Sequence, residues 1–203
     1  MRLFSPCFIS GWIYPDAIFR NRTTEKLLYL TFDDGPDPDS TSQLLDLLKK
    51  YNIKALFFCD GRAAENYPDL IDKIKSDGHL IGNHGYNHLN GWLTPLNDYI
   101  TDAEKAALYT SSSLFRPPFG RLRLDQYRKL NETYKIVFWD IMPYDFDSRL
   151  GSKTSLEILK IKIRPGSIIV LHDNKTSNSH EYIEEYILFA RDEGYRFDPL
   201  FLG

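Results

Sequence analysis

The sequence predicts an α/β protein built on a parallel sheet, because two kinds of segment alternate along the whole chain. Short runs rich in β-branched and aromatic residues have the composition of buried strands, and the stretches between them have the spacing of amphipathic helices. The predicted strands are residues 27–32, 54–58, 79–83, 113–116, 135–139, 167–172 and 195–200. The predicted helices are residues 40–51, 66–76, 95–109, 123–131, 154–163 and 180–193. Right-handed crossovers between parallel strands then allow either an open doubly wound sheet or an incomplete barrel.

The helix predicted over 40–51 has the clearest boundary signals. Ser40 stands at its N-cap, Gln43 occupies the capping-box position, and the leucines between residues 44 and 48 form its apolar stripe. Gly78 and Gly194 follow two other predicted helices, at the position of a C-terminal cap.

Composition excludes several classes of protein. The chain has 203 residues with 25 basic and 28 acidic side chains, so its net charge of −3 gives no field that would grip a nucleic-acid backbone. No apolar run reaches the roughly 18 residues that a membrane span needs. Cys7 and Cys59 make neither a disulfide framework nor a zinc-finger spacing. We therefore expect no nucleic-acid partner, no membrane span and, by default, a monomer.

Residues 1–25 are expected to form a leader that packs on a single domain spanning residues 26–203. The leader is apolar and aromatic, but prolines and a glycine interrupt it, and only Arg2 serves as a basic flank. No small-residue cleavage site follows. The sequence therefore favours a cytoplasmic protein, with a signal peptide, export or surface association as the alternative.

Polar side chains follow five of the predicted strands. Because the carboxyl ends of parallel strands share one edge of the sheet, we expect these side chains to converge there although they are far apart in sequence. They are Asp33 and Asp34, His84 and His88, Arg116, then Asp140, Asp145 and Asp147, and finally His172 and Asp173.

The two histidines and the two adjacent aspartates indicate a metal site. His84 and His88 are spaced i, i+4, which places both imidazoles on one side of a turn, although such a pair also occurs in solvated loops. With a carboxylate as third ligand they would hold a divalent ion and leave positions open for water and substrate. Keeping Asp33 and Asp34 both ionised favours a cation beside them. One would bind the metal and the other would accept a proton from water, unless they only cap backbone N–H groups in the turn.

Arg116 and His172 are the other candidate catalytic groups. Arg116 precedes two prolines that hold the segment extended, so its guanidinium could clamp one carboxylate bidentately; the alternative is a surface arginine. His172 ends an apolar strand, where it is either a satisfied core histidine or a general acid held by an aspartate. Asp145 is the first candidate for that aspartate.

These motifs resemble those of the polysaccharide deacetylase family, which is carbohydrate esterase family 4 and contains the NodB homology domain. The resemblance covers roughly residues 27–200. Thr31 to Pro36, which reads TFDDGP, is similar to the first family motif, and Arg116 to Gly120, which reads RPPFG, is similar to the third. The resemblance implies an incomplete (β/α)7 barrel.

The resemblance also implies a role for each motif residue. The implied ligands of one divalent metal ion, with zinc expected and cobalt or nickel also admitted, are Asp34, His84 and His88. The implied catalytic groups are the base Asp33, its partner Arg116, the backbone N–H of Phe119 at the oxyanion, the acid His172 and Asp145, which orients the acid.

Three positions depart from the family pattern. Gly85 stands where serine or threonine is usual, Phe146 replaces a tryptophan and Val170 replaces a leucine. None of the three removes a ligand or a proton-transfer group, so we expect them to alter substrate preference. The predicted substrate pocket consists of Tyr86, Trp92, Tyr144, Phe146 and Val170.

The implied activity is metal-dependent hydrolysis of an N-acetyl group on an acetylated amino-sugar oligo- or polysaccharide. Two alternatives stay open within the same fold. One is removal of an O-acetyl or N-formyl group by the same centre, and the other is an inactive member that binds glycan without turnover.

Overall fold

The computed structural model describes residues 10–199, and its seven strands pair in parallel in one sheet. The order across the sheet is β5-β4-β3-β2-β1-β6, and β7 pairs with β1 off this path. The strands are β1 Leu27–Asp33, β2 Leu56–Cys59, β3 Leu80–Asn83, β4 Leu114–Phe115, β5 Lys135–Ile136, β6 Ser167–His172 and β7 Arg196–Phe197. Each falls on one of the seven predicted strand segments, so that prediction is confirmed.

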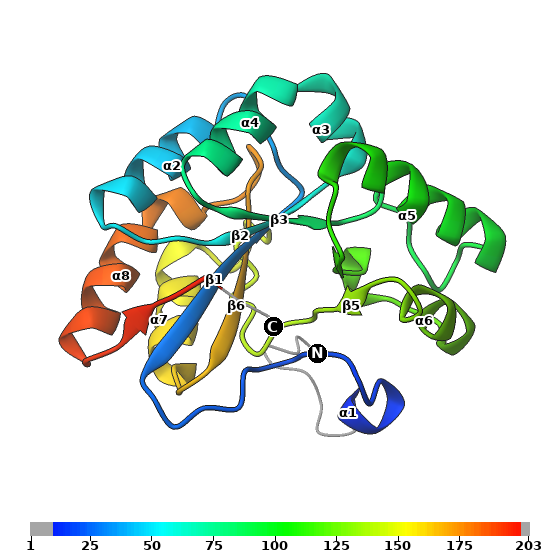
Figure 1. The fold of residues 1–203 in the computed structure, drawn as a ribbon. Helices are drawn as coiled ribbons and strands as arrows, with labels where there is room; N and C mark the ends of the chain where they lie inside the picture. Colours follow the sequence, from blue (N-terminus) through cyan, green and yellow to red (C-terminus); the bar gives the residue numbers. More distant parts are fainter. Residues whose placement is uncertain (1–9, 200–203) are drawn as a thin grey trace.

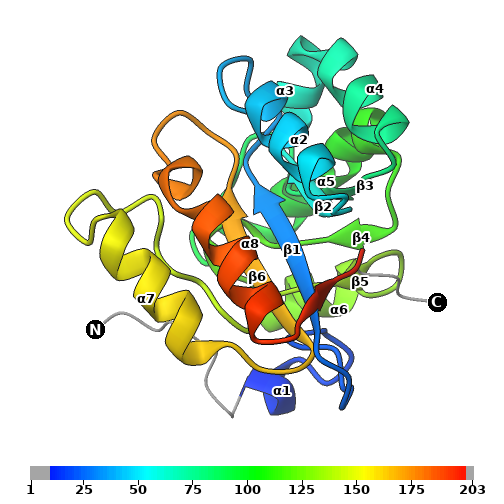
Figure 2. The same cartoon turned by 90° about the vertical axis from the view of Figure 1, so that its left-hand side faces the viewer.

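Helices surround this sheet, in which β1 and β6 lie side by side (Figure 1). The view turned by 90° shows α7 and α8 covering the side of the sheet on which β6 lies (Figure 2). The helices are α1 Ser10–Ile13, α2 Thr41–Lys50, α3 Gly61–Asn66, α4 Pro68–Ser76, α5 Leu96–Thr110, α6 Leu124–Leu130, α7 Ser152–Lys162 and α8 Ile183–Asp192. Gly78 and Gly194 have φ of +81° and +82°, the left-handed conformation expected of C-terminal caps.

The sheet curls into an incomplete barrel, and only short contacts join its two edges. Beyond β5 the chain passes along β6, where the Asp140 N–H donates to the Ile168 carbonyl at 2.8 Å and Ile141 forms a bridge to Ile169. The prediction of an incomplete (β/α) barrel is confirmed.

The N-terminal segment contacts the residues that follow β5, close to where the two edges of the sheet approach each other. Ile18 forms a parallel bridge with Val137, just beyond β5, and the Phe19 ring stacks on Phe138 with centroids 4.7 Å apart. The described part of the predicted leader therefore lies against the barrel, while the boundary at residue 25 stays a prediction.

The register between neighbouring strands determines which residues lie side by side at the carboxyl ends of the strands. Asp33 at the end of β1 pairs with His172 at the end of β6, and Cys59 at the end of β2 pairs with Asn83 at the end of β3. Every residue of β1 after Leu27 is buried, as a central parallel strand covered on both faces requires. The side chains that follow these strands are thereby brought to one edge.

Two local predictions were wrong. The helix α3 begins at Gly61, whereas the sequence predicted a helix only from residue 66, because six residues are too few to show a helical period. Ser40 stands at the N-cap of α2 as predicted, but its side chain makes no capping hydrogen bond and instead donates to the buried carboxylate of Asp173 at 2.6 Å. Gln43 likewise bonds to the Asp39 carbonyl rather than completing a capping box.

Within residues 10–199 no helix is long and apolar enough to cross a membrane. Cys59 is buried with a free thiol, and Cys7 lies outside the described residues.

Candidate metal centre and catalytic groups

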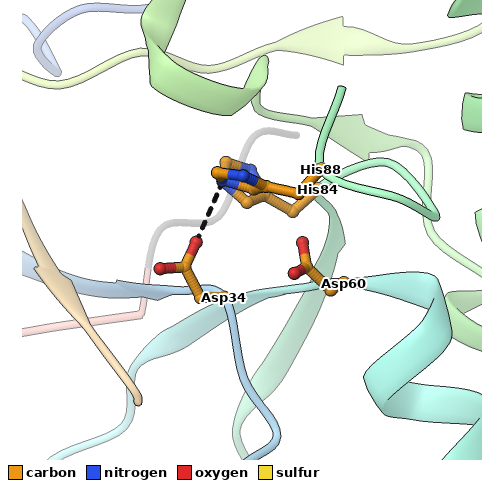
Figure 3. A group of neighbouring side chains, drawn as sticks. All are labelled: Asp34, Asp60, His84 and His88. Atoms are coloured by element: carbon orange, nitrogen blue, oxygen red, sulfur yellow. Dashed lines mark ion pairs between the residues drawn. The ribbon is translucent and has the colours of Figure 1, made fainter. Parts of the chain in front are cut away.

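Four side chains at the carboxyl ends of β1, β2 and β3 point toward one another. They are Asp34, Asp60, His84 and His88, and one potential ligand atom from each lies within 4.8 Å of all the others (Figure 3). The Asp34 Oδ1 atom is 3.6 Å from His84 Nε2 and 3.2 Å from His88 Nε2. Ligands about 2.0–2.2 Å from a tetrahedral zinc ion lie about 3.3–3.6 Å apart. The distances from Asp34 to both histidines therefore fit a divalent ion held by these three predicted ligands.

The orientation of His84 supports this interpretation. Its Nδ1 lies 2.9 Å from the Arg116 carbonyl, so Nδ1 carries the proton and the Nε2 lone pair faces Asp34. Burial lowers the pKa of His84 to about 4, which keeps the imidazole neutral, the form that binds metal. A lone pair facing a carboxylate is repulsive unless a cation separates them.

Asp102 of α5 holds the loop that carries both histidines. Its carboxylate accepts hydrogen bonds from the backbone N–H groups of Tyr86 at 2.7 Å and Asn87 at 3.0 Å. Gly85 has φ of +77°, and a Cβ there would lie 2.9 Å from Asp102 Oδ2. The glycine at this departure from the family pattern is therefore required by the local backbone and by the close approach of Asp102.

Asp33 lies beside the cluster and is held by Arg116. Arg116 is completely buried, and its Nη1 donates to Asp33 Oδ1 at 2.6 Å and to Thr31 Oγ1 at 2.7 Å. The remaining N–H groups donate to the carbonyls of Val137 at 3.2 Å and Phe138 at 2.8 Å, so the contact with Asp33 is single and not bidentate as predicted. The other carboxylate oxygen, Oδ2, lies 3.8 Å from His84 Nε2 and is directed toward the cluster.

His172 and Asp145 form a second buried pair at the same edge. Asp145 is 2.9 Å from His172 Nδ1 through Oδ1, and its Oδ2 accepts from the His172 backbone N–H at 2.8 Å and from Ser177 Oγ at 2.6 Å. Burial alone lowers the pKa of His172, but the carboxylate of Asp145, helped by those of β1, raises it to about 9. The Phe146 ring packs edge-on against the imidazole with centroids 4.8 Å apart. His172 is thus protonated at neutral pH with Nδ1 fixed, which leaves Nε2 as the free proton donor.

A cavity of about 480 Å³ joins the two halves of this site, and its volume is typical of small-ligand sites. It is lined by polar groups of the site and by apolar side chains, among them Asp33, Asp34, His84, His88, Phe119, Tyr144, Phe146, Val170 and His172. Phe119 has a left-handed backbone with φ of +59°, and its ring packs against His88.

Two of the five predicted pocket residues do not line this cavity, although one of them, Tyr86, lines an adjoining cavity that Asp34 and His88 also border. Tyr86 is buried, hydrogen-bonds to Glu65, and lines an adjoining cavity of about 430 Å³ together with Asp60. Trp92 is 61% exposed, lies near the Arg121 guanidinium, and lines neither cavity.

Asp140 and Asp147 do not join the site. Asp140 forms an ion pair with Arg164, which precedes β6, so it lies toward the opposite edge of the sheet. Asp147 pairs with Arg149 at 2.9 Å. Of the three aspartates that were expected to converge at this edge of the sheet, Asp145 therefore does so, and Asp140 and Asp147 do not.

Residues 20–138 match the family profile described as polysaccharide deacetylase. This chain belongs to the polysaccharide deacetylase family. It is 31% identical to the peptidoglycan-N-acetylmuramic acid deacetylase PdaA of Bacillus subtilis (strain 168) over 91% of this chain and 74% of the relative. It is 33% identical to a peptidoglycan-N-acetylglucosamine deacetylase of Bacillus cereus over 85% of each chain. It is 31% identical to the chitooligosaccharide deacetylase of Rhizobium leguminosarum bv. trifolii over 73% of this chain and 72% of the relative.

Solved structures of this family have a similar fold. The crystal structure of the Bc1960 peptidoglycan N-acetylglucosamine deacetylase superposes with a TM-score of 0.88 at 28% identity, covering 96% of this chain and 95% of that one. The pseudoenzyme BA3943 from Bacillus anthracis shares the fold, with a TM-score of 0.79 at 24% identity over 92% of this chain and 68% of that one. The predictions of this family and of an enzyme of the deacetylase class are confirmed.

Two residues of this deacetylase site were missed by sequence reasoning. Asp60 follows β2 at the same edge as the predicted ligands, and burial together with the charges of Asp34 and Asp33 raises its pKa well above the usual value. Asn174 donates from Nδ2 to Asp34 Oδ2 at 2.7 Å and so helps to orient that carboxylate. The sequence offered one signal for each residue: Asp60 closely follows a predicted strand, and Asn174 lies two residues beyond His172.

Proposed function

We propose that this protein hydrolyses the N-acetyl group of an acetylated amino-sugar oligo- or polysaccharide with the help of one divalent metal ion. The names of the relatives support this substrate class, and they include N-acetylmuramic acid, N-acetylglucosamine and chitooligosaccharide deacetylases. The observation that carries the proposal is the arrangement at the cavity. A carboxylate base, a protonated histidine and a cluster of metal-binding atoms all line the same space.

Asp34, His84 and His88 would hold the metal ion. The Oδ1 atom of Asp34 is buried and has no hydrogen-bond partner among residues 10–199, which is costly unless a cation satisfies it. Imidazole and carboxylate donors suit zinc, and cobalt or nickel also fits. A divalent ion there would polarise the acetyl carbonyl and lower the pKa of an attacking water.

Asp33 would act as the base. Arg116 fixes its Oδ1, so Oδ2 is left to accept a proton from the water that attacks the carbonyl carbon. The backbone N–H of Phe119, at the cavity wall, would donate to the oxyanion that develops on the acetyl oxygen.

His172 would act as the acid. As the carbon–nitrogen bond breaks, its Nε2 proton passes to the amine nitrogen, which is otherwise a poor leaving group. Asp145 keeps His172 charged before transfer and stabilises its orientation throughout. The products are acetate and a free amino sugar.

The side chains at the acyl side of the cavity are apolar. Phe146 packs on His172 and Val170 lies on the wall, so both would contact a small acyl methyl group. This contact favours acetyl over formyl, whereas it does not distinguish an amide from an ester.

A substrate panel tests the proposal. Metal-reconstituted protein is incubated with N-acetyl chito-oligosaccharides, peptidoglycan fragments, O-acetyl xylan and N-formyl amino sugars, and released acetate or formate is quantified. The proposal predicts acetate from the N-acetylated substrates, loss of release on chelation and recovery with added zinc. Release from O-acetyl xylan alone, or formate alone, would reassign the enzyme. Glycan binding without release would assign an inactive member of the fold; the neighbour BA3943 is described as a pseudoenzyme.

A further inference from the structure

Asp60 is a fourth acidic side chain at the proposed metal centre, and the family resemblance assigns it no role. It comes from the end of β2, whereas the three predicted ligands come from the ends of β1 and β3. Figure 3 shows its carboxylate facing the cluster formed by Asp34, His84 and His88.

The orientation of Asp60 differs from that of an ordinary helix cap. Asp60 occupies the N-cap of α3, where an aspartate usually accepts a hydrogen bond from the first turn of the helix, but its side chain makes no such bond. Its Oδ1 is buried and has no hydrogen-bond partner within the described part of the chain, and the same holds for Asp34 Oδ1. Two buried carboxylate oxygens left unsatisfied in one cluster are costly, and a shared cation offsets that cost.

The backbone around Asp60 is tied to both ligand loops. The Asp60 N–H donates to the Gly35 carbonyl at 3.0 Å, and the Gly61 N–H donates to the Gly85 carbonyl at 2.8 Å. A Cβ on Gly61 would lie 2.7 Å from the Ala106 Cα, so only glycine allows α3 to approach α5 this closely. These contacts fix Asp60 relative to Asp34 and His84 before any metal binds.

We propose that Asp60 is a fourth protein ligand of this metal ion. The inference rests on the proposed metal-dependent function and gives the centre two carboxylate and two imidazole donors. Four protein ligands close a tetrahedral zinc site, so an ion that also binds water and substrate here must accept five or six ligands. Manganese and cobalt accept such coordination, and manganese in particular favours additional oxygen donors. Asp60 therefore raises the affinity for manganese and cobalt more than that for zinc.

Metal affinity is the direct test. Dissociation constants for Zn²⁺, Co²⁺ and Mn²⁺ are measured by competition with a chromophoric chelator for the parent, Asp60→Asn and Asp39→Asn. Asp39 is an exposed carboxylate on the cavity shared with Asp60, so it controls for the loss of one nearby negative charge. We expect Asp60→Asn to weaken Mn²⁺ and Co²⁺ binding by about 10- to 100-fold, zinc binding by less, and Asp39→Asn to change little. The visible spectrum of the Co²⁺ form should become more intense in Asp60→Asn as the coordination number falls.

Thermal denaturation separates a ligand from a structural residue. Without metal, Asp60→Asn should have a higher Tm than the parent because an unpaired buried carboxylate is removed. With Co²⁺ bound, the parent should have the higher Tm. A lower Tm in both states would indicate a structural role and overturn the proposal.

The outcomes also separate this inference from the proposed function. If His88→Ala abolishes Co²⁺ binding while Asp60→Asn leaves the affinity and the spectrum unchanged, Asp60 is not a ligand and the proposed function stands. If the parent binds none of the three ions, both proposals fail together.

Discussion

Replacing Asp145 by asparagine should remove the charge that keeps His172 protonated. The pKa of His172 stands at about 9 against an ordinary value of 6.5, a difference that corresponds to about 3 kcal/mol in favour of the charged form. Asp145 supplies the main favourable contribution through the 2.9 Å contact with Nδ1, and a hydrogen bond to a charged group contributes about 1.5–3 kcal/mol. Because burial is then opposed only by the weaker effects of the Asp34 and Asp33 charges, we expect the pKa of His172 in Asp145→Asn to fall by about 1–2 pH units.

The sign of the pH dependence follows from the raised pKa. The pair stabilises the folded metal-free protein fully below the ordinary pKa of 6.5, and this stabilisation is lost as pH rises through about 9. The acid function is lost over the same range, so the alkaline limb of kcat/KM should move to lower pH in the variant. Metal binding neutralises Asp34 and should itself lower the pKa of His172 in the parent.

Titration by NMR is the assay, and it is simple because the chain has only five histidines. His172→Gln assigns the resonance. Ser177→Ala is the matched control, since it removes a donor to Asp145 at 2.6 Å but keeps the carboxylate charge, and it should not lower the pKa of His172. The reasoning is refuted if the resonance titrates at the same pH in Asp145→Asn and in the parent.

Two further predictions concern stability. Arg116→Met should lower the free energy of unfolding of the metal-free protein by about 3–5 kcal/mol in urea denaturation, because it leaves Asp33 buried without its cation. Adding Asp33→Asn should recover part of that loss, and a second substitution that only adds to it would contradict the explanation. Gly85→Ala should destabilise the protein and weaken Co²⁺ binding, because the new Cβ is both strained and 2.9 Å from Asp102. The matched control is Gly151→Ala, whose φ is also positive, at +75°, but whose Cβ meets nothing within 4 Å, so equal effects on Co²⁺ binding would count against the account.

The fold was predictable because its longest strands, β1 and β6, are almost wholly buried. The strand β1 reads as a continuous apolar run ending in Asp33, which is the pattern of a parallel strand covered on both faces. Two-residue strands such as β4 and β5 still fell on predicted segments, because turn residues bound them in sequence. The helix α3 and the true partner of Ser40 were not predictable, because both depend on contacts with residues distant in sequence.

Site residues were predictable from the sequence where their position along a strand is enough to bring them to the site. Asp33, Asp34 and His172 lie directly at strand ends, so parallel topology brings them together regardless of detail. Side-chain position is set by tertiary packing, and the exposed Trp92 does not line the cavity. For the same reason Asp60, for which the sequence predicted no role, lies in the structure at the metal centre.

The central claim is that Asp33 moves a proton while its neighbours hold the metal. The most direct measurement compares the parent with Asp33→Asn for metal content per chain and for acetate released from an N-acetyl chito-oligosaccharide. The account predicts equal metal content in the two proteins and loss of acetate release in the variant. Acetate release at the parental rate, or loss of the metal together with activity, would contradict it.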